Sequence, residues 1–247
     1  CSAAISACEK GERWEEALCL LGEMLQSLIA PNVITCNSAI SACEKCGQWE
    51  LASQFLDEMA KERLEPNVYA FAAGISACEK ADQWERALNL LSVMHAASIE
   101  LNIFTLSATT SACEKKGKWA IVVDVLSKAR FQRLRPSEIT YNAAISAFEK
   151  GHHWDGALSL WREVRGKGLE RSAITYNAAI SACEKRTRWR HALVLASGTL
   201  NDRVLPDVIS YNAVLLACFS GRQWGRALAL TGAMTKEGIE PDIEGCC

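Results

Sequence analysis

The sequence predicts an all-α fold: a right-handed α-solenoid (superhelix) of about seven 35-residue helix-turn-helix repeats. Three observations support this prediction. A Glu-Lys pair recurs every 35 residues, from Glu9-Lys10 to Glu184-Lys185, and each repeat contains two apolar patterns with helical spacing. Tryptophan keeps the same step without an insertion or deletion: Trp14, Trp49, Trp84, Trp119, Trp154, Trp189 and Trp224. A fixed period of this length is typical of repeat proteins, whose units pack on their neighbours.

The first half of each repeat has the pattern of an amphipathic helix. In residues 35–46, Cys36, Ala39, Ile40 and Cys43 are spaced i, i+3, i+4 and i+7, which places them on one helix face. A short break follows at residues 45–48. We therefore expect the first helix to bury this face and to end before the break.

The second half of each repeat predicts another helix. It begins near Trp49 and ends before Pro66, since proline cannot continue a helix. Two helices of about 12 residues are marginal on their own, so hairpins must stack to bury their apolar faces. We expect one solenoid over residues 1–247, with repeats at 1–32 (partial), 33–67, 68–102, 103–137, 138–172, 173–207 and 208–242 and a tail at 243–247.

The charge distribution is uneven. The formal net charge is -2, but residues 128–191 contain 13 Lys and Arg against 6 Asp and Glu. A basic segment favours an anionic partner, although a charged outer face on solvated helices would give the same count.

The cysteines and histidines do not predict a catalytic, metal or cofactor site. Six of the 12 cysteines keep the 35-residue step: Cys8, Cys43, Cys78, Cys113, Cys183 and Cys218. Equivalent residues of stacked helices lie about 8–10 Å apart, beyond the Cα limit of about 7 Å for a disulfide, so we interpret them as packing residues. The 4 histidines form no Ser-His-Asp or Cys-His arrangement, and no apolar run reaches the ~18 residues that span a bilayer. We therefore expect neither an enzyme nor a membrane protein.

A second stripe on the first helix has a different character. Ile34, Asn37, Ser41 and Lys45 are spaced i, i+3, i+7 and i+11, so they share a side that the apolar face does not use. An amide beside an apolar side chain suits the edge and face of a nucleic-acid base, and a row of lysines suits a phosphate backbone. An ordinary solvent-exposed polar face is the other interpretation.

The repeats resemble the pentatricopeptide repeat family. The resemblance is carried by the segment Ile-Thr-Tyr-Asn-Ala-Ala-Ile-Ser-Ala from Ile139, by the Pro-Asp pair at residues 206–207, and by the period of 35. Tetratricopeptide repeats have a period of 34. The resemblance covers essentially the whole chain. The tryptophan that opens the second helix departs from the family pattern, which more often has an aliphatic residue there.

The resemblance implies sequence-selective binding of single-stranded RNA, with one base read by each repeat. In the family, the fifth and last residues of a repeat form the base-reading pair. The implied pairs are Ser2 with Asn32, Asn37 with Asn67, Ala72 with Asn102, Ser107 with Ser137, Asn142 with Ser172, Asn177 with Asp207, and Asn212 with Asp242. They correspond to a target near A-Y-N-A-C-U-U. The pairs that begin with Ala72 and Ser107 fit the family pattern poorly.

The resemblance also implies residues that sandwich the bases and residues that contact phosphates. The sandwiching residues are Ile34, Tyr69, Phe104, Ile139, Ile174 and Ile209. The phosphate-contacting residues are Lys10, Lys45, Lys80, Lys115, Lys150 and Lys185.

The family acts mostly in the mitochondrion or chloroplast, in RNA processing, stability, editing or translation, where other RNA-processing proteins are further partners. No targeting segment is visible in the chain. A protein-protein interaction scaffold without RNA readout is the alternative, because α-solenoids commonly present concave surfaces to peptides.

Overall fold

Every regular element in the described part of the chain is a helix, as expected. The computed structural model describes residues 2–11, 13–26, 32–62, 64–169, 172–201, 204 and 207–236. The first helices of the repeats are α1 (Ser2–Lys10), α3 (Val33–Lys45), α5 (Val68–Lys80), α7 (Ile103–Lys115), α9 (Glu138–Lys150), α11 (Ala173–Glu184) and α13 (Val208–Ser220). The second helices are α2 (Trp14–Gln26), α4 (Trp49–Lys61), α6 (Trp84–Ala96), α8 (Trp119–Phe131), α10 (Trp154–Gly166), α12 (Trp189–Asn201) and α14 (Trp224–Lys236). The expected all-α solenoid of helical hairpins is confirmed. The predicted repeat starts at residues 33, 68, 103, 138, 173 and 208 are the first residues of α3, α5, α7, α9, α11 and α13.

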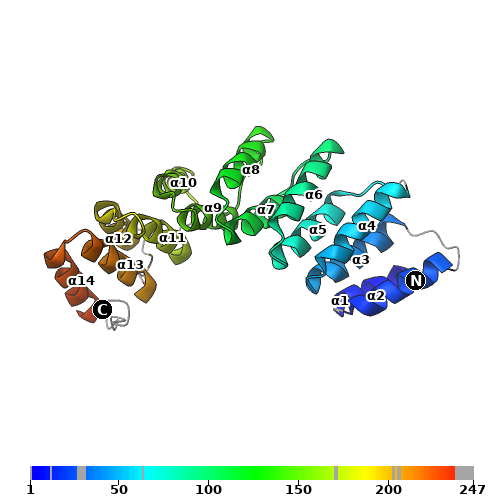
Figure 1. Cartoon of the computed structure of the whole chain (residues 1–247), viewed down its shortest axis with the longest axis horizontal. Coiled ribbons are helices and arrows are strands. Elements are labelled where there is room, and N and C mark those ends of the chain that lie inside the picture. The colour runs from blue at the N-terminus through cyan, green and yellow to red at the C-terminus, as the bar shows by residue number, and fades with distance from the viewer. Residues whose placement is uncertain are drawn as a thin grey trace. The chain divides into compact units, whose positions relative to one another are not determined.

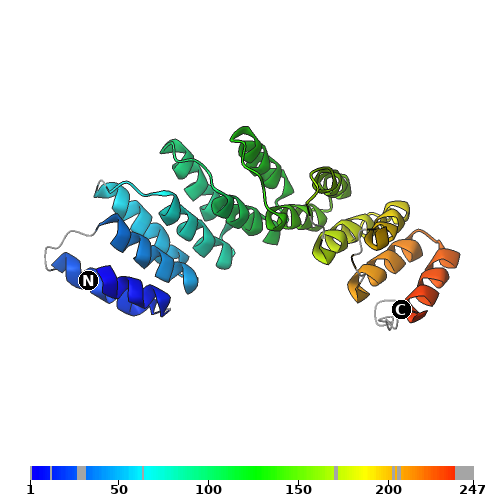
Figure 2. The same ribbon diagram turned by 180° about the vertical axis from the view of Figure 1, so that it is seen from behind.

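The helices form two compact units. The N-terminal unit comprises Cys1–Cys113 and Asp124–Pro136, and the C-terminal unit comprises Glu114–Val123 and Ser137–Cys247. Figures 1 and 2 show the hairpins following one another along the chain within each unit. First helices pack on first helices, α1 on α3 and α3 on α5 in one unit and α9 on α11 and α11 on α13 in the other.

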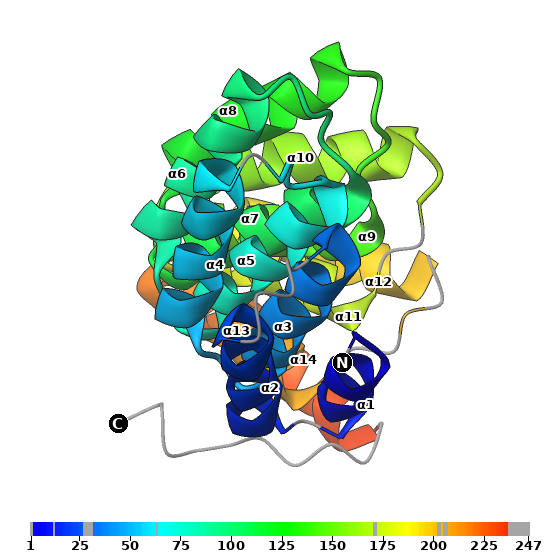
Figure 3. The same cartoon turned by 90° about the vertical axis from the view of Figure 1, so that its right-hand side faces the viewer.

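The second helices form a separate layer beside the first helices. In Figure 3, α2, α4 and α6 of the N-terminal unit lie to the left of α1, α3 and α5. Four second helices pack both against the first helix of their own repeat and against that of the next: α2 with α1 and α3, α4 with α3 and α5, α10 with α9 and α11, and α12 with α11 and α13. This arrangement leaves the other side of the first helices available for a binding surface.

The core consists of the apolar face that the helical spacing predicted. Ala39, Ile40 and Cys43 of α3 are fully buried, and Ile180 and Cys183 occupy the equivalent positions in α11. The cysteines at this position are therefore packing residues, and alanine beside them allows the two helices of a hairpin to approach closely.

The turn between the two helices of a hairpin has a repeated backbone conformation. Its second residue has a positive φ, between 55° and 70°, in six repeats: Gly47, Asp82, Gly117, His152, Thr187 and Arg222. Glycine adopts this left-handed conformation at no steric cost, whereas the other four residue types pay a penalty. The conserved turn brings each second helix to start at its tryptophan, as predicted.

Candidate nucleic-acid interface

Six large apolar side chains are exposed at the second residue of successive first helices. They are the residues that the family pattern implies as base-sandwiching: Ile34 at 68% exposure, Tyr69 at 76%, Phe104 at 77%, Ile139 at 68%, Ile174 at 65% and Ile209 at 65%. Single exposed apolar residues are common on soluble proteins, but a row with a fixed step is not. Each unit therefore presents three apolar side chains at equivalent positions of its first helices.

The structure brings together the two members of three predicted base-reading pairs. Asn37 Nδ2 donates to Asn67 Oδ1 at 3.3 Å. Asn142 Nδ2 donates to Ser172 Oγ at 3.3 Å. Asn177 Nδ2 donates to the Asp207 carboxylate, with distances of 2.9 Å to Oδ2 and 3.2 Å to Oδ1. Since all three asparagines are only half-buried, each pair can contact a ligand.

The other four predicted pairs are less complete. Ala72 has no polar side chain to offer, although Asn102 is present beside α7. Ser107 and Ser137 belong to different units. The side chain of Ser2 and all of Asp242 lie outside the described residues, so only Asn32 and the half-buried Asn212 of those two pairs can be placed.

In several repeats the last residue is held in place because it also caps the next first helix, although the Ser172 side chain makes no capping hydrogen bond. Asn32 Oδ1 accepts a hydrogen bond from Thr35 N at 2.8 Å, and Asn67 Oδ1 accepts one from Ala70 N at 3.0 Å. Asp207 Oδ1 accepts from Ser210 N at 2.7 Å. Asn, Asp and Ser are the preferred N-cap residues, since their side-chain oxygens bind amides that the helix leaves unpaired. The residue types suited to base reading are thus also those that the helix start requires.

The carboxylate of Asp207 is stabilised in its charged form. Burial raises its pKa, but hydrogen bonds from Ser210 N, from the Asn177 amide and from the Ser210 hydroxyl together outweigh burial and bring the pKa below its ordinary value. Asp207 is therefore an ionised acceptor at neutral pH.

A row of buried hydroxyls lies next to these pairs, and the sequence pattern alone did not reveal it. The third residue of a repeat is Thr or Ser in five repeats, with at most 3% exposure: Thr35, Thr105, Thr140, Thr175 and Ser210. Thr175 Oγ1 donates to Asn142 Oδ1 at 2.5 Å, across the boundary between two repeats. The recurrence of Thr or Ser with the 35-residue step was the available signal. From the sequence alone, a small polar residue on the buried face of a helix is interpreted as ordinary packing, because its hydrogen-bond partner in another repeat is not known.

Three of the lysines that the family pattern assigns to phosphates, Lys80, Lys150 and Lys185, contact acidic side chains of the preceding repeat. Lys80 Nζ lies 2.6 Å from Glu44 Oε1, and Lys150 Nζ lies 2.5 Å from Glu114 Oε1. Lys45 Nζ donates to the Glu9 carbonyl oxygen at 2.8 Å. Lys185 pairs in the same way with Glu149, and Lys10 and Lys115 are exposed. Much of the charge of the lysine row is therefore balanced within the protein.

Further cations lie beside Lys115, Lys150 and Lys185 at the hairpin turns of the C-terminal unit. The stretches 114–121, 149–156, 184–191 and 219–226 carry ten Lys and Arg against four Asp and Glu. The equivalent stretches 44–51 and 79–86 of the N-terminal unit carry three against five. Two of these arginines stack on tryptophans of the preceding repeat, Arg188 on Trp154 and Arg226 on Trp189, each with Cζ at 4.7 Å from the ring centre. Stacking leaves the guanidinium edge available to oxygen ligands.

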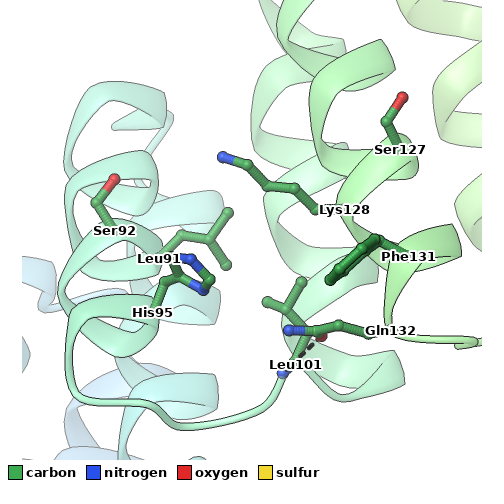
Figure 4. A pocket seen from close by; sticks show the side chains of 8 residues that line it. All are labelled: Leu91, Ser92, His95, Leu101, Ser127, Lys128, Phe131 and Gln132. Carbon is green, nitrogen blue, oxygen red and sulfur yellow. Dashed lines mark hydrogen bonds between the residues drawn. The ribbon is translucent and has the colours of Figure 1, made fainter.

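A cavity of about 430 Å³ lies elsewhere in the N-terminal unit. Figure 4 shows it between the ends of α6 and α8, with Leu91 and His95 on one side and Lys128 and Phe131 on the other. Gln132 closes one end, where its Oε1 accepts a hydrogen bond from Leu101 N at 3.2 Å. Its lining comes from second helices and their loops, so the cavity is separate from the row on the first helices.

The described residues contain no cluster of three or more His, Cys, Asp or Glu side chains that could hold a metal ion. None of the helices in the described ranges has both the length and the apolar character needed to span a bilayer.

Comparison with family models matches most of the chain. The model described as PPR repeat family matches residues 31–78 and 136–185, and the model of the pentatricopeptide repeat domain matches residues 89–150 and 198–244. A PPR repeat model matches residues 1–27. The fold and these matches together define a helical repeat protein. The chain belongs to the pentatricopeptide repeat family.

Solved structures show the same fold. The crystal structure of the pentatricopeptide repeat protein PPR10 from maize is 22% identical, with a TM-score of 0.62 over 98% of this chain and 40% of that one. PPR10 in complex with an 18-nt psaJ RNA element gives a TM-score of 0.55 at 16% identity, over 97% of this chain and 40% of that one. The PPR domain of Arabidopsis thaliana protein-only RNase P 1, in complex with tRNA, gives a TM-score of 0.61 at 12% identity, over 67% of this chain and 88% of that one. This chain therefore spans about two-fifths of the length of PPR10. No curated protein sequence matches it.

Proposed function

We propose that this chain binds single-stranded RNA sequence-selectively, with one base read by each repeat. The observation that carries the proposal is the repeated site on the first helices. In repeats 33–67, 138–172 and 173–207, an exposed apolar side chain accompanies a hydrogen-bonded polar pair. The relatives PPR10 and the PPR domain of RNase P 1 have been solved with RNA, which supports the same class of ligand here.

The chemistry of the pairs matches that of pyrimidine bases. Uracil has a hydrogen on N3, which an acceptor such as the Asp207 carboxylate can bind. Cytosine has a bare N3 acceptor, to which the hydroxyl of Ser172 can donate when its hydrogen turns from Thr175 Oγ1 toward the base. The asparagine amides of Asn142 and Asn177 supply donors for the O2 atom that both bases share. The pair Asn142 with Ser172 thus suits cytosine, and Asn177 with Asp207 suits uracil.

The apolar row supplies the sequence-independent part of the affinity. Bases that lie between Ile139 and Ile174, or between Ile174 and Ile209, would bury both faces against aliphatic side chains. Contacts to base faces tolerate any base, so this row would determine spacing while the polar pairs determine identity. The phosphates would be met by the exposed cations of the hairpin turns as well as by lysines that exchange their glutamate partners.

A reciprocal exchange tests the assignment. Asp207→Ser should change the preference of repeat 173–207 from uracil to cytosine, and Ser172→Asp should change that of repeat 138–172 from cytosine to uracil. Both residue types cap helices well, so neither exchange disturbs the start of the following helix. Binding of the variants to short RNAs that differ at these two bases measures the change, with each variant serving as the control for the other. Unaltered base preference in both variants would contradict the assignment.

A protein-binding scaffold is the second candidate. It is favoured by the cavity between α6 and α8, whose edge includes Phe131 at 90% exposure. Selection from a randomised pool of single-stranded RNA distinguishes the two. Enrichment of a motif related to A-Y-N-A-C-U-U supports RNA reading, whereas the absence of any enriched motif supports the scaffold.

The cellular role that we propose is control of transcripts in the mitochondrion or chloroplast. A chain that only binds RNA can affect processing, stability, editing or translation, since it blocks or exposes the segment to other proteins. Imaging of the complete protein with a C-terminal fluorescent tag tests the location, and a cytosolic signal would contradict it.

A further inference from the structure

Three side chains form a closed ring where repeat 138–172 meets the next repeat. The Thr175 hydroxyl donates to Asn142 Oδ1 at 2.5 Å. Asn142 Nδ2 donates to Ser172 Oγ at 3.3 Å, and Ser172 Oγ lies 3.2 Å from Thr175 Oγ1. The Glu138 carboxylate is a longer acceptor for the same Nδ2, at 3.4 Å. Both ends of the Asn142 amide are therefore occupied.

The same ring is present in the next repeat. Asn177 Nδ2 donates to Asp207 Oδ2 at 2.9 Å, and the Ser210 hydroxyl contacts both Asn177 Oδ1 and Asp207 Oδ1. Here the negative charge of Asp207 would repel an amide oxygen. The carboxylate and the hydroxyl thus favour the same orientation of the Asn177 amide.

Repeat 33–67 lacks the third member of the ring. Its asparagine pair is present, with Asn37 Nδ2 at 3.3 Å from Asn67 Oδ1. The position equivalent to Thr175 and Ser210 is Ala70, which is fully buried and has no hydroxyl. As a result, Asn37 Oδ1 is buried without a hydrogen-bond partner among the described residues. A buried amide oxygen without a partner is rare and costly.

The ring decides which end of the amide faces a ligand. When a hydroxyl binds Oδ1, the remaining hydrogen-bonding capacity of the asparagine is a hydrogen on Nδ2. The residue then selects bases with an acceptor at the contacted position, such as O2 of a pyrimidine. Without the hydroxyl, the amide can turn over and present its oxygen to the base instead. The asparagine can then also bind a base that has a hydrogen-bond donor at the contacted position.

We propose that the buried hydroxyl at the third position of a repeat is a positioning residue for base selection in the preceding repeat. Thr175 and Ser210 hold the amides of Asn142 and Asn177 as hydrogen-bond donors toward a pyrimidine, and Ala70 leaves Asn37 less selective. The inference rests on the proposed RNA reading for its functional half. Its structural half, the fixed amide, can be measured without RNA.

Three substitutions separate the hydroxyl from packing. Thr175→Val keeps the branched shape but removes the hydroxyl, Thr175→Ser keeps the hydroxyl, and Ala70→Ser adds one where the chain has none. Thr109→Val is the matched control, because Thr109 is also fully buried but its hydroxyl donates to the Thr105 carbonyl oxygen at 2.7 Å rather than to an asparagine.

The first measurement is NMR of the side-chain amide groups in the protein labelled with ¹⁵N-asparagine. We expect Thr175→Val to shift the Asn142 amide signals and to speed their exchange with water, while Thr175→Ser and Thr109→Val leave them unchanged. Ala70→Ser should slow exchange of the Asn37 amide. Equal behaviour of the Asn142 amide in the wild type and Thr175→Val would overturn the proposal whether or not RNA binds.

The second measurement is binding to short RNAs with each base in turn opposite the repeat concerned. Thr175→Val should reduce the preference of repeat 138–172 for pyrimidine over purine about fivefold, the range of one neutral hydrogen bond. Ala70→Ser should increase the preference of repeat 33–67 for pyrimidine over purine by a similar factor. RNA binding with base preferences unmoved by both variants would refute the positioning role alone. No binding of any RNA by the wild type would instead refute the proposed function.

Discussion

Lys185 Nζ lies 2.5 Å from Glu149 Oε1, so two charged residues of neighbouring repeats are ion-paired on the face expected to meet RNA. The Ser181 hydroxyl donates to the same Glu149 oxygen at 3.1 Å. Lys150 with Glu114, and Lys80 with Glu44, repeat the relationship. An ion pair on the protein surface contributes little to stability. However, the glutamate occupies the lysine ammonium group, which could otherwise bind an incoming phosphate.

Replacing the acid should therefore strengthen RNA binding. In Glu149→Gln the amide oxygen still accepts from Ser181, while Lys185 becomes available to a phosphate. We expect tighter binding and a steeper salt dependence. The slope of log K against log salt should become more negative by about 0.7, the contribution of one new phosphate contact to a single strand. Titrations at several salt concentrations measure it. Glu50→Gln changes the net charge equally on an exposed part of α4 and should leave the slope unaltered; an equal change in both variants would disprove the pairing argument.

Two isoleucines of α11 should separate binding from stability. Ile180 is fully buried, whereas Ile174 is 65% exposed. Ile180→Ala should lower the free energy of unfolding by about 2–5 kcal/mol through the cavity it leaves. Ile174→Ala should change it by less than about 0.5 kcal/mol yet weaken RNA binding about tenfold or less, because a base loses one apolar face. Urea unfolding and RNA titration measure the two effects. RNA affinity unchanged in Ile174→Ala would show that the exposed row does not contact bases.

The depressed pKa of Asp207 predicts a specific pH dependence. A carboxyl whose pKa is lower in the folded than in the unfolded protein adds stability above its ordinary pKa of about 3.9, and that stability is lost as the pH falls through the folded value. Asp207→Asn should thus be less stable than the wild type near neutral pH, with the difference disappearing in acid. Urea midpoints over the pH range test this, with Asp57→Asn on the exposed side of α4 as control. If the stability loss relative to the wild type depended on pH in the same way for Asp207→Asn and Asp57→Asn, the predicted role of the Asp207 carboxylate would be wrong.

The uracil preference of repeat 173–207 should not depend on pH in the physiological range. Asp207 remains ionised throughout, so its carboxylate accepts the uracil N3 hydrogen equally well at about pH 5.5 and about pH 7.5. Competition between uracil- and cytosine-containing RNAs at both values checks this. A preference that fades toward the lower pH would mean that the carboxyl is protonated in the complex.

The buried cysteines of the ladder, such as Cys113 and Cys183, should be chemically inert in the folded protein. Burial raises the pKa of the Cys183 thiol to about 12 and that of Cys113 to about 11, so both stay protonated at neutral pH. We expect alkylation by iodoacetamide, followed by mass spectrometry, to modify the exposed Cys19 before Cys113 and Cys183, which should react only after unfolding in urea. Rapid modification of Cys183 in the native protein would contradict a packing role.

The sequence alone predicted the repeat boundaries and the core because both depend on local rules. A helix buries the residues that recur at its own period, and the step of 35 aligned Ile40 with Ile75 and Ile180 without any knowledge of contacts. The same regularity, combined with the family pattern, identified Asn142 with Ser172 and Asn177 with Asp207, which the structure places in hydrogen-bond contact.

Local rules of this kind could not predict the side-chain contacts between repeats. Thr175 and Asn142 are 33 residues apart, and Lys185 and Glu149 are 36 apart; neither separation belongs to a helix or to the repeat itself. Which hydroxyl meets which amide depends on how closely neighbouring first helices pack and on their relative rotation. The sequence by itself thus determined that this chain is a helical repeat solenoid and where its core and its polar stripe lie. Only the tertiary structure decided that Lys80, Lys150 and Lys185 are ion-paired and that Asn37 Oδ1 has no partner among the described residues, because those outcomes depend on distances between atoms of different repeats.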